Sequence, residues 1–189
     1  TDVWLTQLSM LLADVIMHAA VSSLGVRPDV ICGHSFGEFP ALYAAGAMTL
    51  EQAIAGTRAR ADAINTDGVR AGKMLSTTAA AADVANLIAQ SGAEVYLAND
   101  NAPDQTVVGG TPEGIATFKT LLDSQGVKSQ LLAVPRPFHT PLMAATQEPF
   151  RLALNAIPFQ TPSSAFRSSV TNDKVAAAAD VSRNLVDQM

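Results

Sequence analysis

The chain has 189 residues, of which 48% are hydrophobic and 15% are charged, and its formal net charge is −5. This length supports a buried core in one domain, or in one domain with an inserted subdomain. The acidic balance argues against nucleic acid as a main partner. No uninterrupted apolar run approaches the roughly 18 residues that span a bilayer, and the start does not resemble a signal peptide, so we expect no membrane partner.

The first elements expected along the chain are a helix, a short strand and a second helix. Apolar residues recur at helical spacing between Thr6 and Leu24, and Gly25 is a natural stop. Residues 29–32 read DVIC, which suits a short buried strand, and residues 36–47 suit a helix. A strand followed by a tight turn and a helix is therefore predicted around residue 35.

A further helix is predicted to begin after Thr49, because Thr49 and Gln52 form a capping box, and to run to about Ala63. A linker follows at residues 65–72. The chain begins inside an apparent helix and ends abruptly at LVDQM, so we expect a fragment of something longer.

The pattern beyond this linker changes to short strands alternating with helices. Strands are expected at 73–77, 94–99, 105–110 and 128–134, and helices at 79–90 and 112–124, the latter capped by Thr111. Strand–helix–strand–strand–helix–strand is the ferredoxin-like order, so residues 72–134 are predicted to form a small inserted subdomain. Residues 141–156 then read as another helix.

Residues 33–37 read GHSFG, a Gly-x-Ser-x-Gly motif at the predicted strand–helix junction. Such a turn lifts a serine hydroxyl into the open, and its glycines leave space where a Cβ would not fit. The following helix directs its first N–H groups at the same place, where they can stabilise an oxyanion. Ser35 is therefore the candidate nucleophile; the alternative is a chance match to a short motif.

A serine hydroxyl needs a base, and histidine is the usual one at neutral pH. His139 lies in RPFHTP, between prolines that stiffen the backbone, and is the best candidate. His34 is next to Ser35, but neighbours in a tight turn point different ways, so His34 is a poor base that can line the pocket. His18 reads as a surface or packed histidine on the first helix.

The acid that would orient His139 is not evident. Asp100, Asp104 and Asp123 lie between the serine and the histidine, as in Ser–His–acid hydrolases, but all three fall in the predicted insert. Solvated loops and a helix face explain them more simply. A Ser–His dyad, with a backbone carbonyl holding the imidazole, fits better.

Positive charge is scarce, which draws attention to Arg60 on the predicted helix after the motif. If this helix folds back along its predecessor, the guanidinium approaches Ser35. Arginine grips a carboxylate through two parallel hydrogen bonds, so a buried Arg60 would indicate an acyl substrate with a free carboxylate. The alternative is a surface arginine, like Arg58 and Arg70.

Together these residues resemble a known family, the malonyl-CoA:acyl-carrier-protein transacylases. The similarity is greater still to the acyltransferase domains of polyketide and polyunsaturated fatty acid synthases. The resemblance covers essentially the whole chain and rests on GHSFGE at 33–38, Arg60, PFHTPLM at 137–143, SSVTND at 168–173 and LVDQM at 185–189.

The family's fold implies an α/β class: an α/β-hydrolase-like core with a parallel sheet, and a ferredoxin-like insert. Residues 1–71 and 135–189 would form the core, truncated at both ends, and residues 72–134 the insert. The family's N-terminal Gly-Gln-Gly-rich strand has no counterpart here, and the chain stops just after Gln188.

The resemblance implies a ping-pong transfer. Ser35 would carry the acyl ester, His139 would act as base, Arg60 would clamp the malonyl carboxylate, and His34 would lie beside the acyl group. Malonyl-CoA is the implied substrate and the phosphopantetheine thiol of an acyl carrier protein the implied acceptor. Neighbouring synthase domains are implied as further partners, with no bound cofactor.

Three further roles follow from the resemblance. The backbone N–H of Phe36 would be one oxyanion donor, and Gln188 would help to hold the histidine or the polar network of the site. Phe138, just before the histidine, accompanies malonyl rather than methylmalonyl units in these domains. Arg136 departs from the usual residue at its position, which leaves the extender unit open.

Two other classes of function remain. A serine esterase or thioesterase-like hydrolase would share the serine turn, and a degenerate acyltransferase would serve only in docking. Docking of a carrier protein would use local basic residues, for which the candidates are Arg70, Lys73, Lys128 and Arg136. Cys32, the single cysteine, excludes an internal disulfide and suits a reducing cytoplasm. With three histidines besides, no metal-ligand cluster is expected.

Overall fold

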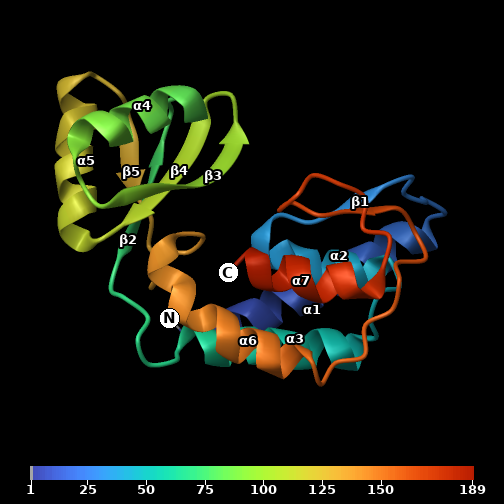
Figure 1. Ribbon diagram of the computed structural model, residues 1–189. Helices are drawn as coiled ribbons and strands as arrows, with labels where there is room; N and C mark the ends of the chain where they lie inside the picture. The colour runs from blue at the N-terminus through green and yellow to red at the C-terminus, as the bar shows by residue number, and fades with distance from the viewer. Residues whose placement is uncertain (1) are drawn as a thin grey trace. The chain divides into compact units, whose positions relative to one another are not determined.

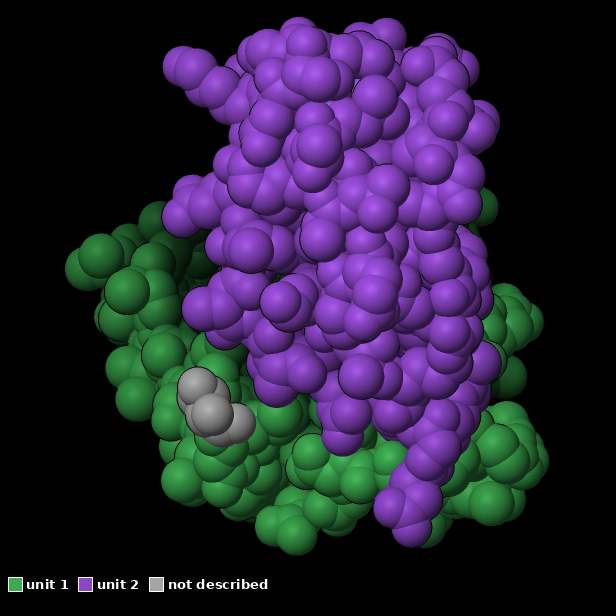
Figure 2. All heavy atoms as spheres, turned by 90° about the vertical axis from the view of Figure 1, so that its left-hand side faces the viewer, with its two compact units in different colours: residues 1–66, 146–188 green, residues 67–145, 189 purple. Residues whose placement is uncertain are grey.

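The computed structural model describes residues 2–189, which form two compact units (Figures 1 and 2). Unit 1 holds the residues up to 66 together with residues 146–188, and unit 2 holds residues 67–145 together with Met189. Unit 2 thus extends beyond both ends of the segment 72–134 expected for the insert. Apart from Met189, unit 2 is one continuous segment placed between the two parts of unit 1.

Unit 1 is mainly helical. Its helices are α1 (Val3–Ser23), α2 (Glu38–Ala44), α3 (Leu50–Ile64), α6 (Gln147–Leu154) and α7 (Ala178–Asp187). Helix α1 packs against α2 and α3, α3 packs against α6, and α6 packs against α7 (Figure 1). The α3 prediction is confirmed in detail, because Thr49 and Gln52 form both hydrogen bonds of a capping box.

Two short parallel strands run through unit 1, β1 (Ile31–Cys32) and β6 (Phe166–Arg167). Ile31 pairs with Phe166 in register, and Phe166 is buried. Because the strands are parallel, their carboxyl ends lie at the same edge of the pair. The GHSFG turn leaves β1 at this edge, and the turn at residues 168–173 leaves β6.

Helix α1 is long and apolar enough to cross a membrane, by length and composition only, and 11% of its most apolar 18-residue stretch is buried. A core helix of a soluble protein and a signal sequence meet the same criteria, so one such helix is weak evidence. The helix carries the polar residues Gln7, Asp14 and His18, which interrupt its apolar run. The absence of a membrane partner stays a prediction.

Unit 2 has a four-stranded antiparallel sheet in the order β3-β4-β2-β5. Its elements in chain order are β2 (Lys73–Thr77), α4 (Ala81–Ser91), β3 (Val95–Ala102), β4 (Gln105–Gly110), α5 (Pro112–Ser124) and β5 (Ser129–Leu131). This sequence of elements and this strand order confirm the predicted ferredoxin-like arrangement. The mixed α/β class is confirmed as well.

The core of unit 2 forms where α4 and α5 cover one face of the sheet (Figure 1). Its buried members are Leu75, Val84, Leu87, Val95, Val108, Ile115, Phe118 and Leu122. The side chain of Thr111 caps α5 by accepting from Gly114 N, and Pro112 occupies the first turn, as predicted.

Several predicted elements differ from the structure. The strand expected at 29–32 covers only Ile31–Cys32, and it is not buried as expected, because Ile31 is half-buried and Cys32 is exposed. The strand expected at 128–134 is paired only over Ser129–Leu131. The helix expected at 141–156 consists of the 3₁₀-helix η2 (Pro141–Thr146) followed by α6. The helix expected at 36–47 begins as the 3₁₀-helix η1 (Ser35–Gly37) and continues as α2, which ends at Ala44. The differences in extent all lie at the ends of elements, which local pattern places least precisely.

Candidate active site

The GHSFG turn holds Ser35 in a left-handed backbone conformation, with φ of 51°. Such a value is uncommon for a residue other than glycine and stores strain that the surrounding structure must maintain. Gly33 permits the close turn: a Cβ on it would lie 2.5 Å from Glu38 N and closer still to the Gly37 carbonyl. A Cβ on Gly37 would meet nothing within 4 Å. Of the two glycines, only Gly33 is needed to avoid a steric overlap of a Cβ with the backbone.

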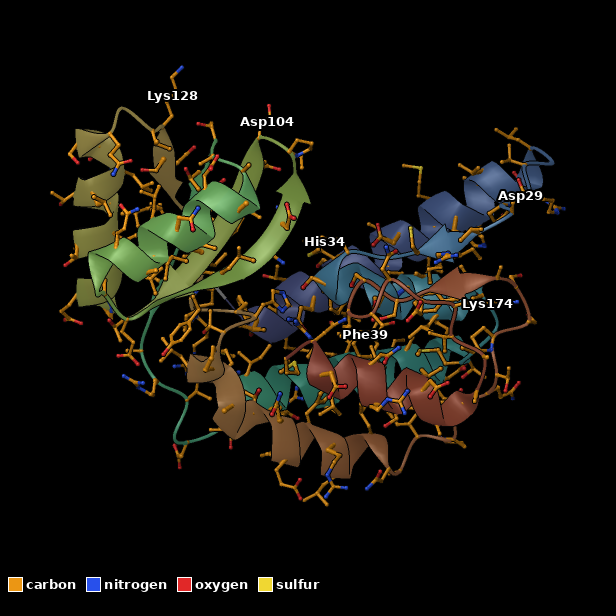
Figure 3. All side chains as sticks on the ribbon, turned by 45° about the horizontal axis from the view of Figure 1, so that its top comes forward. Asp29, His34, Phe39, Asp104, Lys128 and Lys174 are labelled. Atoms are coloured by element: carbon orange, nitrogen blue, oxygen red, sulfur yellow. The ribbon has the colours of Figure 1, made fainter. Side chains whose placement is uncertain are left out.

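The turn joins β1 to α2 through η1. The Gly37 N–H donates to the His34 carbonyl at 2.9 Å, which closes the turn around Ser35. Ser35 is half-buried, while His34 is exposed in the segment that leaves β1 (Figure 3). The backbone therefore takes the strand–turn–helix course that the motif predicted.

Arg60 lies in α3 beside this turn. Its Cζ atom is 5.8 Å from the centroid of the Phe36 ring, and Arg60 is only 3% exposed. Burial lowers the pKa of the Arg60 guanidinium to about 10, so it remains charged at neutral pH. By contrast, Arg58 and Arg70 are exposed and pair with Asp62 and Glu94, respectively.

A buried carboxylate, Glu38, lies three residues after Ser35 and was not singled out from the sequence. Glu38 is 1% exposed and accepts four hydrogen bonds. One carboxylate oxygen accepts from the Ser168 hydroxyl at 2.9 Å and from both the N–H and the hydroxyl of Ser169. The other accepts from Gln188 Nε2 at 2.9 Å. Burial raises the pKa of Glu38 above its ordinary value, and these hydrogen bonds partly oppose that shift.

The Glu38 network joins three segments of unit 1 that are far apart in the sequence. They are the first turn of α2, the turn at residues 168–173 after β6, and the end of α7 at Gln188. Asn172, in the second of these, also has a positive φ of 56°, and its carbonyl accepts from Arg167. The sequence around Glu38 does not indicate that it is buried, because its hydrogen-bond partners lie 130 to 150 positions away.

His139 lies in unit 2, also in a left-handed conformation, with φ of 60°. Its segment approaches β2 and β4 closely, because glycines leave space for it. A Cβ on Gly72 would lie 2.5 Å from Pro137, and one on Gly109 would lie 2.6 Å from Thr140 Cγ2. The buried Thr140 hydroxyl donates to the Pro137 carbonyl at 2.7 Å and closes the turn.

Phe138 and His139 are both half-buried, and their ring centroids are 6.4 Å apart. The structure thus groups the predicted site residues in two sets. Unit 1 holds His34, Ser35, Phe36, Arg60 and Gln188, and unit 2 holds Phe138 and His139.

The three aspartates considered as orienting acids are all exposed residues of unit 2. Asp104 lies in the β3–β4 hairpin turn (Figure 3), and Asp123 pairs with Lys119 on α5. Asp100 lies in β3, where the pairing with β4 is irregular. Ordinary surface positions account for all three.

Lys128, one of the four basic residues considered for docking, lies apart from Lys73. Lys73 begins β2, whereas the Lys128 carbonyl accepts from Thr78 N just beyond the other end of the same strand (Figure 3). Thr78 follows Lys73 by five positions, which corresponds to about 17 Å along the strand. Arg70 is engaged by Glu94.

The arrangement suits chemistry on an acyl group. A strained serine turn at a helix start can present a nucleophile and backbone donors for an oxyanion. A buried arginine beside it can hold a carboxylate. Among residues 2–189, no group of three or more His, Cys, Asp or Glu side chains is placed to hold a metal ion.

Comparison with known proteins relates this chain to acyltransferases. Residues 1–188 match the family model described as the acyl transferase domain. The malonyl CoA-acyl carrier protein transacylase of Bacillus subtilis (strain 168) is 32% identical over an alignment of 171 residues, and the match covers 87% of this chain and 54% of that protein.

Two solved structures show the same fold. The acyltransferase domain of an iterative polyketide synthase in enediyne biosynthesis is 32% identical, with a TM-score of 0.90 over 100% of this chain and 50% of that one. A malonyl-transacylase solved in complex with its type II polyketide synthase acyl-carrier protein is 26% identical. Its TM-score is also 0.90, over 99% of this chain and 62% of that one.

The chain therefore spans about half the length of the transacylase and of the enediyne acyltransferase domain that it matches. The match to the family model covers nearly all of its residues, and the motifs around Ser35 and His139 lie within it. The resemblance inferred from the sequence is confirmed: the chain belongs to the acyl transferase domain family.

Proposed function

We propose that this protein transfers a malonyl group from coenzyme A to Ser35, and then to the phosphopantetheine thiol of an acyl carrier protein. The observation that carries the proposal is the position of a buried, charged Arg60 beside the residue that follows Ser35. The names of the relatives support the same substrate and acceptor.

In the first half-reaction, His139 accepts the proton of the Ser35 hydroxyl as Oγ attacks the thioester carbonyl. The carbon–sulfur bond breaks, the thiolate of coenzyme A leaves with the proton from His139, and a malonyl ester remains on Ser35. The Phe36 N–H, at the start of the helix, donates to the oxyanion. Arg60 pairs with the free carboxylate and keeps the acyl group in one pose.

In the second half-reaction, the carrier thiol gives its proton to His139 and attacks the ester carbonyl. The Ser35 oxygen leaves and takes the proton back, so no proton is gained or lost over the cycle. Water competes with the thiol for the same ester, and a transferase must exclude it.

Two residues refine this proposal. Phe138 precedes His139 and would crowd the α-carbon of the acyl group, which favours malonyl over methylmalonyl. A discrimination of one methyl group is worth about 1–3 kcal/mol, so some methylmalonyl transfer is expected. Gln188 would hold the polar network of the site through Glu38, to which it donates at 2.9 Å.

Intact mass spectrometry of the full-length protein tests the proposal. The protein is exposed briefly to malonyl-CoA or methylmalonyl-CoA, and a carrier protein is then added, with Ser35→Ala treated in parallel. We expect a malonyl adduct on the wild type alone and its passage to the carrier. Loss of the adduct to water while the carrier stays unloaded would indicate a hydrolase, and no adduct with either substrate would indicate a non-catalytic domain.

A further inference from the structure

Helix α3 presents two buried residues, one helical turn apart, to aromatic rings of the serine turn and α2. Gly56 faces Phe39, because a Cβ on Gly56 would lie 2.6 Å from the edge of that ring. Arg60 follows one turn later and lies 5.8 Å from the centroid of Phe36. Phe36 and Phe39 stack, with centroids 5.7 Å apart and an interplanar angle of 25°.

These four residues form a continuous packed set, Gly56–Phe39–Phe36–Arg60. Gly56 leaves the space that Phe39 fills, and Phe39 supports Phe36 by stacking. Phe36 in turn contacts the guanidinium. Phe39 is fully buried and points from α2 into unit 1 (Figure 3), and Phe36 is 5% exposed. Because interiors are close-packed, the position of each ring constrains that of the next.

The contact matters because Arg60 carries its charge in a buried position. Desolvation alone lowers the pKa of Arg60 to about 10, so the cation persists at neutral pH. The negative face of an aromatic ring attracts a guanidinium, and more strongly when water is excluded. The ring therefore favours the charged form in one orientation.

We propose that the Phe36 side chain is a positioning residue for Arg60 and, through it, sets the preference for acyl groups that carry a free carboxylate. This inference rests on the proposed function, in which Arg60 binds the malonyl carboxylate. Phe36 then has two separate roles. Its backbone N–H belongs to the serine turn, and its ring holds the Arg60 guanidinium that selects the substrate.

A second contact on the same helix provides a matched control. Arg58 lies two residues before Arg60, and its Cζ is 5.3 Å from the centroid of the Trp4 ring on α1. This guanidinium is exposed and pairs with Asp62. Trp4→Leu removes an aromatic–arginine contact from α3 that involves neither Phe36 nor Arg60. It therefore reports the general effect of losing such a contact on this helix.

The test replaces Phe36 in the full-length protein by mono-, di- and trifluorinated phenylalanine. Fluorine weakens the negative face of the ring stepwise with little change in ring size. The readout is the ratio of kcat/KM for malonyl-CoA to kcat/KM for acetyl-CoA, which lacks the carboxylate. We expect this ratio to fall stepwise, by roughly threefold to thirtyfold in total, through the malonyl-CoA value alone. The same ratio in Trp4→Leu should equal that of the wild type.

The outcomes separate this inference from the function on which it rests. If Arg60→Ala lowers the ratio but fluorination leaves it unchanged, the role of the Phe36 ring is overturned and the carboxylate clamp stands. An equal loss with both substrates would make Phe36 a merely structural residue and would also overturn the inference. If Arg60→Ala leaves the ratio unchanged, the clamp and the inference fail together.

Discussion

Each unit holds one candidate catalytic residue in a left-handed turn, but the two turns are stabilised by different means. The Ser35 turn in unit 1 is followed by a buried carboxylate, Glu38, whose four hydrogen bonds reach two distant segments. The His139 turn in unit 2 depends on close packing instead. It is held by proline, by close approach to Gly72 and Gly109, and by the Thr140 hydroxyl.

Two turns with similar left-handed backbone strain can therefore be stabilised by different kinds of interaction. In unit 1, the turn depends on buried charge and directional hydrogen bonds, which respond to pH and to the loss of a partner. In unit 2, it depends mainly on volume, because small residues allow the backbone to approach. Substitutions that change only the packing volume, or only the hydrogen bonds, separate the two kinds of stabilisation.

The largest effect is expected from Gly33→Ala. Its Cβ would overlap backbone atoms of Gly37 and Glu38, which cannot move without opening the turn. We expect loss of Ser35 acylation by at least about a thousandfold, comparable to removal of a nucleophile, as measured by the rate of adduct formation. Gly37→Ala is the matched control, because its Cβ meets nothing; an equal loss there would contradict the assignment.

Gly109→Ala makes the corresponding change in unit 2 and should be milder. Its Cβ would meet Thr140 Cγ2, a side-chain methyl group, at 2.6 Å. We expect destabilisation of about 1–3 kcal/mol from overpacking, measured by urea unfolding. Pairing it with Thr140→Ser removes that methyl group while keeping the hydroxyl, and should restore most of the loss. No recovery in the double variant would show that the methyl contact is not the cause.

Removal of the Glu38 carboxylate should cost more than removal of a neutral hydrogen bond. Glu38→Ala leaves the buried Ser168 and Gln188 donors without their acceptor, so we expect a loss of about 2–4 kcal/mol in the free energy of unfolding. Thr140→Val in unit 2 breaks one neutral hydrogen bond and should cost about 1 kcal/mol. Equal losses in urea unfolding would mean that the additional hydrogen bonds of Glu38 contribute nothing to stability.

Two carboxylates should respond to pH in opposite directions. Burial raises the pKa of Glu38 above 4.5, so the folded state holds that proton more tightly than the unfolded chain. Relative to Glu38→Gln, the wild type should therefore lose stability as pH rises from 4.5 through the raised pKa. The Arg70 guanidinium lowers the pKa of Glu94, so its contribution is present above pH 4.5 and is lost as pH falls through the lowered pKa. Thermal unfolding against pH checks both; slopes of the same sign would refute the contrast.

Much of this could be predicted from local pattern. The capping box at Thr49, the Thr111–Pro112 helix start and the βαββαβ order depend on residues close in sequence, and all three are observed. The GHSFG motif predicted the strand–turn–helix course around Ser35 for the same reason, because the residues that form the turn, including the sterically required Gly33, are neighbours in the sequence.

The rest depends on contacts between distant residues. The network of Glu38 needs Ser168, Ser169 and Gln188, at least 130 positions away, so no local pattern marks Glu38 as buried. Likewise, periodicity did not decide whether Arg60 is exposed or buried. Its burial becomes evident only in the folded structure, in which α3 packs against α1, α2 and α6. The break between η2 and α6 reflects tertiary context in the same way.

The most direct test of the central claim is the release of coenzyme A on rapid mixing of the full-length protein with malonyl-CoA, without a carrier protein. The proposed mechanism predicts a burst close to one equivalent in the wild type, because Ser35 is acylated once and then waits for a thiol. The burst should disappear in Ser35→Ala and slow by at least about a hundredfold in His139→Ala. A full burst in Ser35→Ala would show that the nucleophile lies elsewhere and would contradict the account.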